Sequence, residues 1–430
     1  MIDAVAPSFS LSQAYYSGRL SQQLLLVACV AAITGLFASR ALVALSPVVG
    51  LLAACSQPCL RQHLRQWMRL RTVWYFVLPY LFLLLSGLYT TETDVWRHEL
   101  FRTLPYLVVP LGFAVAVPLN ARQRFGVGLL YVALATVLGL CTLGRYLMNP
   151  EEANRLIGVG QNVPAITGIF HIHFSIMLAL AFFFALLLRR HPLATAPART
   201  ALLAAAVLIF LIMHVLAYRT GLLVLYAMLL LDAAMLIVLK GRFRLGLLVL
   251  AALVGLPLVA YHTLEPIQRR VAVTLDDLTQ YRAGNDINDY SLAKRFAAWE
   301  TAVVVASQHR LLGVGPADVD AAMLDQYSYR DFGLLPKNRV MTHNQYLEAA
   351  VGGGVVGLAL WLLMLFGPLL QPALRQNPYV IHFLLMMGVA NLVDSLLQMQ
   401  IGFNLFVFLY GFLVVHAERC SRSATVADPA

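Results

Sequence analysis

Residues 201–239 read ALLAAAVLIFLIMHVLAYRTGLLVLYAMLLLDAAMLIVL, and this stretch decides the fold class. It contains two apolar runs, 201–217 and 222–239, separated by a short connection that carries Arg219. A helix needs about 20 mainly apolar residues to cross the hydrocarbon core of a bilayer. The stretch therefore predicts two membrane helices joined as a tight hairpin, with Arg219 at its tip.

Apolar runs of this kind recur from residue 24 to residue 416, and only 12% of the 430 residues are charged. Soluble domains carry about 25% charged residues, so the composition predicts an all-α integral membrane protein with about twelve transmembrane helices. The predicted spans are 24–38, 41–55, 73–89, 104–119, 126–147, 166–188, 201–217, 222–239, 245–262, 346–370, 379–396 and 400–417. We expect residues 1–430 to form a single polytopic membrane domain, with a disordered cytoplasmic tail at 418–430.

The placement of Lys and Arg predicts the orientation of the spans, because short cytoplasmic loops are enriched in these residues. With a cytoplasmic N-terminus, the inner loops and termini hold sixteen of them and the short outer connections hold six. The sixteen are Arg19, Arg61, Arg65, Arg69, Arg71, Arg122, Arg124, Arg189, Arg190, Arg199, Lys240, Arg242, Arg244, Arg375, Arg419 and Arg422; the six are Arg40, Arg97, Arg102, Arg145, Arg155 and Arg219. Both termini are therefore predicted to be cytoplasmic, and the long segment 263–345, between spans nine and ten, to be periplasmic.

This long segment is the region where we expect function, because loops of more than about 15 residues in a compact protein are usually active-site or binding elements. Ser291 is a capping-type residue that predicts the start of an amphipathic helix at the outer surface. The apolar residues at helical spacing after it are Leu292, Phe296, Trp299 and Val303. A second short helix is predicted after Pro316.

Two outward-facing arginines are candidate ligands of an anion. Arg219 lies on the side where arginine is disfavoured, and Arg295 lies beside Lys294 on the amphipathic helix. Each could instead be structural: Arg219 could reach the lipid headgroups, and Arg295 could be solvated or contact Trp299 through a cation–π interaction. A guanidinium matches a phosphate group bidentately, so the functional interpretation is a pyrophosphate clamp made by both arginines.

His343 is the candidate base. It lies in Thr342-His-Asn-Gln345, where the long segment meets span ten, and Thr342 with Gln345 fits a capping box. We therefore predict that His343 lies in the first helical turn, where the helix dipole keeps the imidazole neutral. The alternative is a polar residue that only starts a helix at the interface.

Weaker candidates have simpler explanations. Asp318-Val-Asp320 has the form of a metal-binding pair, but acids also favour the first turn of a helix, so we expect no metal site there. Asp394, near the outer end of span eleven, could be functional or merely hydrated. His171 and His173 are expected to pack within the bundle.

Several other classes of function are disfavoured. The net charge of +10 comes from arginines and lysines scattered among short loops without interleaved aromatic residues, so nucleic-acid binding is not expected. No GxxxxGK[ST] phosphate loop is present, and the five cysteines have no metal-ligand spacing. We expect neither a metal ion nor a cofactor.

Three motifs, in order along residues 219–360, resemble the O-antigen ligase family, which belongs to one superfamily with the O-antigen polymerases and bacterial protein O-oligosaccharyltransferases. The matching positions are Arg219 with Leu223, then Arg295-Phe-Ala-Ala-Trp299 with Gly313-Val-Gly315, then His343-Asn-Gln-Tyr-Leu347-Glu348 with Gly352-Gly-Gly-Val-Val-Gly357. Each motif alone is weak, whereas three in order on one face are more specific.

The resemblance implies a type C membrane glycosyltransferase of the bacterial inner membrane with a periplasmic active site, metal-independent and inverting. Its donor would be O-antigen on undecaprenyl pyrophosphate, and its acceptor a sugar hydroxyl of the lipid A core oligosaccharide, with membrane lipids around both. Carried onto this sequence, Arg219 and Arg295 would bind the pyrophosphate and His343 would be the general base. Supporting roles would fall to Lys294, Trp299, Asn344, Gln345 and Glu348.

Alternatives remain open at this point. An O-antigen polymerase would share the histidine and the arginines, and protein O-oligosaccharyltransferases are usually longer. A polytopic transporter of lipids or solutes would be expected to have related halves with polar residues at mid-membrane. Here the candidate polar residues gather on one predicted outer face.

Overall fold

The computed structural model describes residues 11–238, 240–330 and 332–427, and these residues form helices and connections without any strand. The all-α class is therefore confirmed. In chain order the helices are α1 Leu11–Tyr16, α2 Arg19–Ala38, α3 Arg40–Cys55, α4 Leu60–Trp67, α5 Arg71–Ser86, α6 Thr93–Arg102, α7 Pro105–Val115, α8 Ala121–Met148, α9 Pro150–Gly158, α10 His171–Leu188, α11 Ala196–Val215, α12 Arg219–Val238, α13 Phe243–Thr263, α14 Glu265–Ala283, α15 Ser291–Gln308, α16 Val319–Tyr329, η1 Pro336–Asn338, α17 Gln345–Phe366, η2 Gly367–Leu370, α18 Pro372–Arg375, α19 Pro378–Ala390, η3 Leu396–Gln398, α20 Gln400–Leu409, the π-helical η4 Tyr410–Val415 and α21 His416–Ala427.

Eight helical stretches among the described residues are long and apolar enough to cross a membrane, and three shorter apolar helices accompany them. The eight are Arg19–Ala38, Ala121–Met148, His171–Leu188, Ala196–Val215, Arg219–Val238, Phe243–Thr263, Gln345–Leu370 and Gln400–Ser423; the three are Arg40–Cys55, Arg71–Ser86 and Pro378–Val393. The predicted span 104–119 is helical only over the 11 residues of α7. At 1.5 Å per residue this is about 16 Å, half of a hydrocarbon core of about 30 Å. The predicted number of twelve spans is thus not confirmed.

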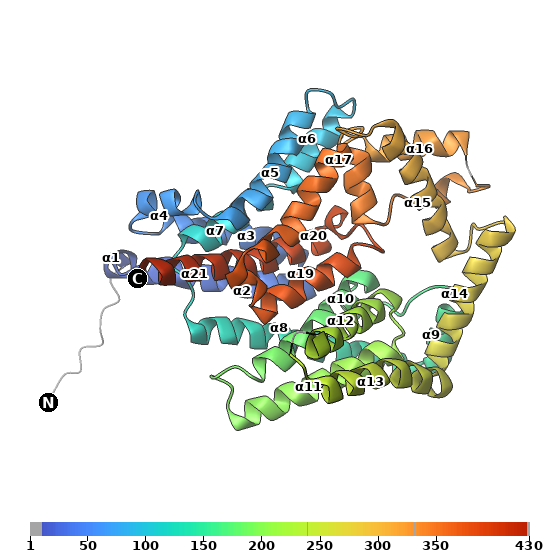
Figure 1. Ribbon diagram of the computed structural model, residues 1–430, viewed down its shortest axis with the longest axis horizontal. Coiled ribbons are helices and arrows are strands. Elements are labelled where there is room, and N and C mark those ends of the chain that lie inside the picture. The colour runs from blue at the N-terminus through green and yellow to red at the C-terminus, as the bar shows by residue number, and fades with distance from the viewer. Residues whose placement is uncertain (1–10, 239, 331, 428–430) are drawn as a thin grey trace.

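The helices differ in how deeply they are buried, although their compositions are similar. Nearly every residue of α10 is buried, including Phe174, Met177 and Leu180, so α10 lies in the centre of the bundle. By contrast α13 buries only Gly246 and Ala260 among its described residues and exposes most of its leucines and valines. Figure 1 shows α13 at the edge of the molecule. Lipid is as apolar as a leucine side chain, so composition alone does not separate a central helix from a lipid-facing one.

The segment 263–345 is mostly helical, and its helices α14, α15 and α16 lie together at one end of the molecule (Figure 1). Alanines form the buried face of α15, whereas the predicted apolar stripe that includes Trp299 and Val303 is only partly covered. Ser291 begins α15 but does not cap it; Asp277 of α14 accepts the Leu292 N–H at 2.7 Å instead.

The tail was predicted to be disordered from residue 418, but residues 416–427 form α21. The reason is Glu418, which is fully buried and accepts the backbone N–H groups of Arg71 and Thr72 at 3.0 and 2.9 Å. The same carboxylate accepts Arg422 Nε at 3.0 Å. Residues 428–430 lie outside the described residues.

Candidate active site

Arg219, Arg295 and His343, the three residues singled out from the sequence, line one cavity of about 400 Å³. They reach it from different elements: Arg219 from the start of α12, Arg295 from α15 and His343 from the connection before α17. Lys294 and His171 line it too. Because these three residues are more than a hundred residues apart from first to last, only the folded chain brings them together.

Helix α14 holds the side chain of Arg219 at the cavity wall. Arg219 Nη1 donates to Thr274 Oγ1 at 3.4 Å and lies 3.9 Å from Asp277 Oδ2, and the side chain remains 30% exposed. The start of α12 packs tightly on α10, because a Cβ at Gly221 would lie 2.6 Å from Ser175 Cβ. Burial raises the pKa of Asp277, while Arg219 and the Leu292 N–H counteract the effect.

Arg295 and Lys294 bring two further positive charges to the cavity. Arg295 Nη1 donates to the Val393 carbonyl at 3.1 Å. Burial lowers the pKa of Arg295, and the negative charge of Asp394 partly offsets the shift. Lys294 Nζ donates to Asn288 O at 3.0 Å and lies 3.4 Å from Asn338 Oδ1.

His343 was predicted in the first turn of the helix, and this position is wrong. Helix α17 begins at Gln345, and Asn344 is its N-cap, accepting the N–H groups of Tyr346 and Leu347 at 2.9 and 3.2 Å. His343 precedes the cap with a left-handed φ of 43°, so the helix-dipole argument for its neutrality does not apply. The N-cap is therefore Asn344, whose backbone is extended, and not the predicted Thr342.

His343 is instead paired with Asp394. Its Nδ1 lies 2.9 Å from Asp394 Oδ1, and the His343 side chain is 32% exposed while that of Asp394 is 8% exposed. Burial alone would raise the pKa of Asp394, but the hydrogen bond from His343 and the charge of Arg295 hold it below its usual value. When Nδ1–H is donated to a carboxylate, Nε2 carries the ring lone pair and is the basic atom.

The polar residues after His343 anchor a neighbouring loop and do not line this cavity. The Gln345 N–H donates to Asn391 O at 2.9 Å, and its side-chain oxygen accepts the Leu397 N–H at 3.1 Å. Glu348 is buried and accepts Gln398 Nε2 at 3.0 Å and the Thr342 hydroxyl. These contacts fix the loop that carries Asp394.

Trp299 lies away from the cavity and does not contact Arg295. Its ring packs edge-on against Phe296 at 5.5 Å, and its Nε1 is buried without a hydrogen-bond partner among the described residues. The cation–π contact considered as an alternative for Arg295 is thus not present; in the described part of the chain, such contacts are made by Arg102 with Phe403 and by Arg330 with Phe332.

Arg270 was missed by the sequence reasoning. This buried residue of α14 donates from Nη2 to Gln161 O at 2.7 Å and to Asn162 Oδ1 at 3.0 Å, and both acceptor residues line the cavity. Burial and the nearby charge of Arg219 lower the pKa of Arg270 to about 10. A helical pattern in residues 265–283 could have predicted the helix, although it does not show that the Arg270 side chain is buried.

The cavity is strongly cationic. Arg219, Lys294 and Arg295 line it, whereas Asp277 and Asp394 stand behind the arginine and histidine side chains and are not part of the lining. Such a site favours an anion with several oxygen atoms, because guanidinium groups bind phosphate bidentately.

The Asp318 carboxylate, considered above as a possible metal ligand, accepts hydrogen bonds from the residues just before α6. The carboxylate accepts the N–H groups of Thr91 and Glu92 at 2.8 and 3.0 Å, and both threonine hydroxyls at positions 90 and 91. As predicted, it stands at the start of a short helix, α16. A carboxylate engaged in four hydrogen bonds and placed next to α6 does not resemble an open metal site.

Residues 198–362 match the family model described as O-antigen ligase. This part of the chain is therefore similar to the O-antigen ligase family. It contains Arg219, Arg295 and His343. The chain is also 25% identical, over 132 residues, to an uncharacterized protein of Haemophilus influenzae, a match that covers 30% of this chain and 33% of the relative. The aligned part thus spans about a third of that relative's length.

The matched region, residues 198–362, does not hold the whole site. Asp394, the partner of His343, and His171 lie outside the matched residues. His171 is the first residue of α10, and Asp394 lies in the loop between α19 and η3.

The glycines of the matched region, residues 198–362, have a structural explanation. The Val314 and Gly315 N–H groups donate to Val351 O and Gly352 O at 2.9 and 3.0 Å. A Cβ at Gly313 would lie 2.4 Å from Gly352 C. Helix α17 is kinked opposite them at Gly354, with φ 58° and ψ −150°. The two glycine motifs therefore allow the backbone of residues 313–315 to contact the backbone of α17. This contact fixes the position of α17, the helix that begins just after His343.

Proposed function

We propose that this chain is an O-antigen ligase, a membrane glycosyltransferase that transfers a polysaccharide from undecaprenyl pyrophosphate to a sugar hydroxyl of the lipid A core at the periplasmic face. The single observation that carries the proposal is the convergence of Arg219, Arg295 and the His343–Asp394 pair on one cationic cavity. The similarity of residues 198–362 to the O-antigen ligase family supports the reaction class.

The donor binds through its pyrophosphate. Arg219 and Arg295 contact the phosphate oxygens, and Lys294 adds charge. The sugar C–O bond to pyrophosphate breaks in the reaction, and the leaving lipid pyrophosphate keeps the electron pair. Fixed cations are most effective where negative charge develops, so the arginines stabilise the transition state and can replace a divalent metal.

His343 activates the acceptor. The acceptor oxygen attacks the anomeric carbon from the face opposite the pyrophosphate, so the configuration at that carbon is inverted. Nε2 of His343 takes the hydroxyl proton as the new bond forms. Asp394 is a positioning residue: it fixes the tautomer of His343 and stabilises the imidazolium that forms.

A reconstituted reaction tests the proposal. The full chain, purified in detergent, is incubated with lipid-linked polysaccharide and with lipid A core. Transfer to the lipid A core is expected, and lipid pyrophosphate is released. Extension of the lipid-linked polymer without a core acceptor would identify a polymerase, and transfer to protein would identify a protein O-oligosaccharyltransferase. Absence of any transfer by folded protein would contradict the assignment and favour a transporter.

A further inference from the structure

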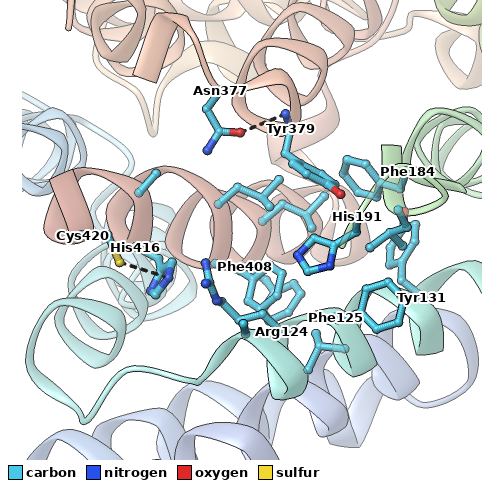
Figure 2. A pocket seen from close by; sticks show the side chains of 18 of the residues that line it. Arg124, Phe125, Tyr131, Phe184, His191, Asn377, Tyr379, Phe408, His416 and Cys420 are labelled. Atoms are coloured by element: carbon cyan, nitrogen blue, oxygen red, sulfur yellow. Dashed lines mark hydrogen bonds between the residues drawn. The ribbon is translucent and has the colours of Figure 1, made fainter. Parts of the chain in front are cut away.

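Figure 2 shows a second cavity, of about 290 Å³, and some of the side chains that line it. It lies at the other end of the helix bundle from the candidate active site. Helix α10 connects the two: His171 lines the candidate active site and Leu188 lines the second cavity. A helix rises 1.5 Å per residue, so these two positions are about 26 Å apart. The second cavity is therefore separate from the site of transfer.

Apolar side chains form most of its wall. They come from helices that are distant in sequence, α2, α8, α10, α20 and η4. The apolar lining residues include Ile33, Val127, Phe184, Leu188, Phe408 and Phe412.

Basic groups stand among these apolar residues. Arg124 projects beside Phe408 in Figure 2, and its Nε is buried without a hydrogen-bond partner among the described residues. The ring of His191 stacks on Phe125 at 5.1 Å, and its Nδ1 accepts the Leu193 N–H at 3.2 Å, so a neutral His191 carries its proton on Nε2. No carboxylate is among the residues that line the cavity.

The charge outside the cavity has the same sign. Further arginines at this end of the bundle are Arg122 near the start of α8, Arg189 and Arg190 after α10, and Arg419 in α21. They belong to the Lys/Arg-rich loops and termini that are predicted to be cytoplasmic. Membrane lipids on the side of such loops are partly anionic. An apolar pocket that holds an arginine whose Nε has no hydrogen-bond partner among the described residues is complementary to a chain that is apolar along its length and negatively charged at its head.

We propose that this cavity binds one acyl chain of an anionic phospholipid, with the phosphate group on Arg124. Its volume is near the lower end of the range of about 300–1,000 Å³ found for small-molecule sites, which suits one chain rather than a whole lipid. A free anion would leave the apolar wall without a partner. The proposal does not depend on the glycosyl transfer at the other end of the bundle.

Lipid binding to the full chain in detergent tests this proposal. Delipidated protein is titrated with phosphatidylglycerol or with phosphatidylcholine, and the midpoint of thermal unfolding is recorded. Phosphatidylglycerol is expected to raise the midpoint at concentrations at which phosphatidylcholine does not. A hydrogen bond to a charged group contributes about 1.5–3 kcal/mol, so Arg124→Gln should weaken phosphatidylglycerol binding about ten-fold or more.

Arg122→Gln is the matched control, because Arg122 lies on the same turn of α8, is exposed and does not line the cavity. It should bind phosphatidylglycerol as the wild type does. Ala417→Phe places a ring into the cavity wall and should abolish the lipid effect in protein that still folds. Equal effects of both lipids, equal binding by Arg124→Gln, or an equal effect of inorganic phosphate alone would overturn the proposal.

Discussion

At the scale of single residues, the His343–Asp394 pair is expected to act in the transfer step and not in binding of the donor. His343→Ala should still bind the lipid pyrophosphate donor, because the arginines that hold the phosphate remain. The rate of transfer should fall about 10²–10⁴-fold, the usual contribution of a general base. Donor binding and single-turnover transfer are measured on the same protein. A variant that transfers polysaccharide at the normal rate would leave the reaction without its base.

Asp394→Asn tests the positioning role. The amide can donate to Nδ1 and so favour the wrong tautomer of the imidazole, in which Nε2 has no lone pair to accept a proton. We expect slower transfer with unchanged donor affinity and a changed pH profile of the rate. A rate and pH profile equal to those of the wild type would show that Asp394 only stabilises the loop.

The arginines should behave differently from the histidine. Arg219→Lys and Arg295→Lys keep the charge but lose the planar guanidinium, so donor binding should weaken about ten-fold or more while protein levels stay unchanged. Arg97→Lys is the matched control, since Arg97 is 69% exposed and, among the described residues, forms an ion pair only with Asp94 in the same helix. Wild-type donor binding in both variants would assign these arginines a structural role.

Candidate site residues could be predicted from the sequence only where a local motif contains them. Arg219, Arg295 and His343 were found in this way, and the structure brings them to one cavity. Asp394 was left undecided because its partner lies 51 residues away along the chain. Arg270 was not found, since nothing local shows that its side chain is buried against residues 160–162.

At the scale of elements, the contact between the glycine motifs can be tested by a pair of alanine substitutions. Gly313 and Gly284 both have φ 68°, so alanine at either position costs about 1–2 kcal/mol of backbone strain. A Cβ at Gly313 also meets the backbone of Gly352 and Gly353 at 2.4 Å, whereas a Cβ at Gly284 meets nothing within 4 Å. Overpacking adds about 1–3 kcal/mol.

Gly313→Ala should therefore lower the thermal midpoint in detergent clearly more than Gly284→Ala does, and it should also reduce transfer by displacing α17. Equal losses in the two variants would mean that the chain relaxes around the contact at no cost.

The elements of segment 263–345 were only partly predictable. The amphipathic helix and the short helix after Pro316 are present as α15 and α16, but α14 was treated as loop. Sequence periodicity located α15 without giving its orientation, because the small alanines pack against α17 and the larger apolar residues stay outside. Close helix packing selects small residues, which a hydrophobicity pattern does not register.

At the scale of the whole molecule, the chemistry should not depend on a divalent metal. EDTA should leave transfer unchanged, because three cationic side chains line the cavity and the Asp318 carboxylate is engaged at the start of α6. The assay is transfer by purified protein before and after chelation. Loss of activity that manganese or magnesium restores would contradict the arginine-based mechanism.

The orientation of the molecule is the prediction on which the others depend, because a lipid-linked donor and a lipid A core must meet at the same membrane face. The arginine-rich loops predict that segment 263–345 is periplasmic, and the candidate cavity opens beside this segment. Cysteine labelling with a membrane-impermeant maleimide measures the side directly. The five native cysteines are first replaced, since only Cys29 among them is buried.

Asn285→Cys then introduces an exposed thiol just after α14, and Ala196→Cys introduces an equally exposed one at the start of α11, in a predicted cytoplasmic loop. Intact cells with a permeabilised outer membrane should be labelled at position 285 and not at 196. After the inner membrane is opened, both should react, which controls for accessibility. Labelling of position 285 only from the cytoplasmic side would place the Arg219–Arg295–His343 cavity on the wrong face for a periplasmic transfer, and the proposed donor and acceptor would have to be abandoned together.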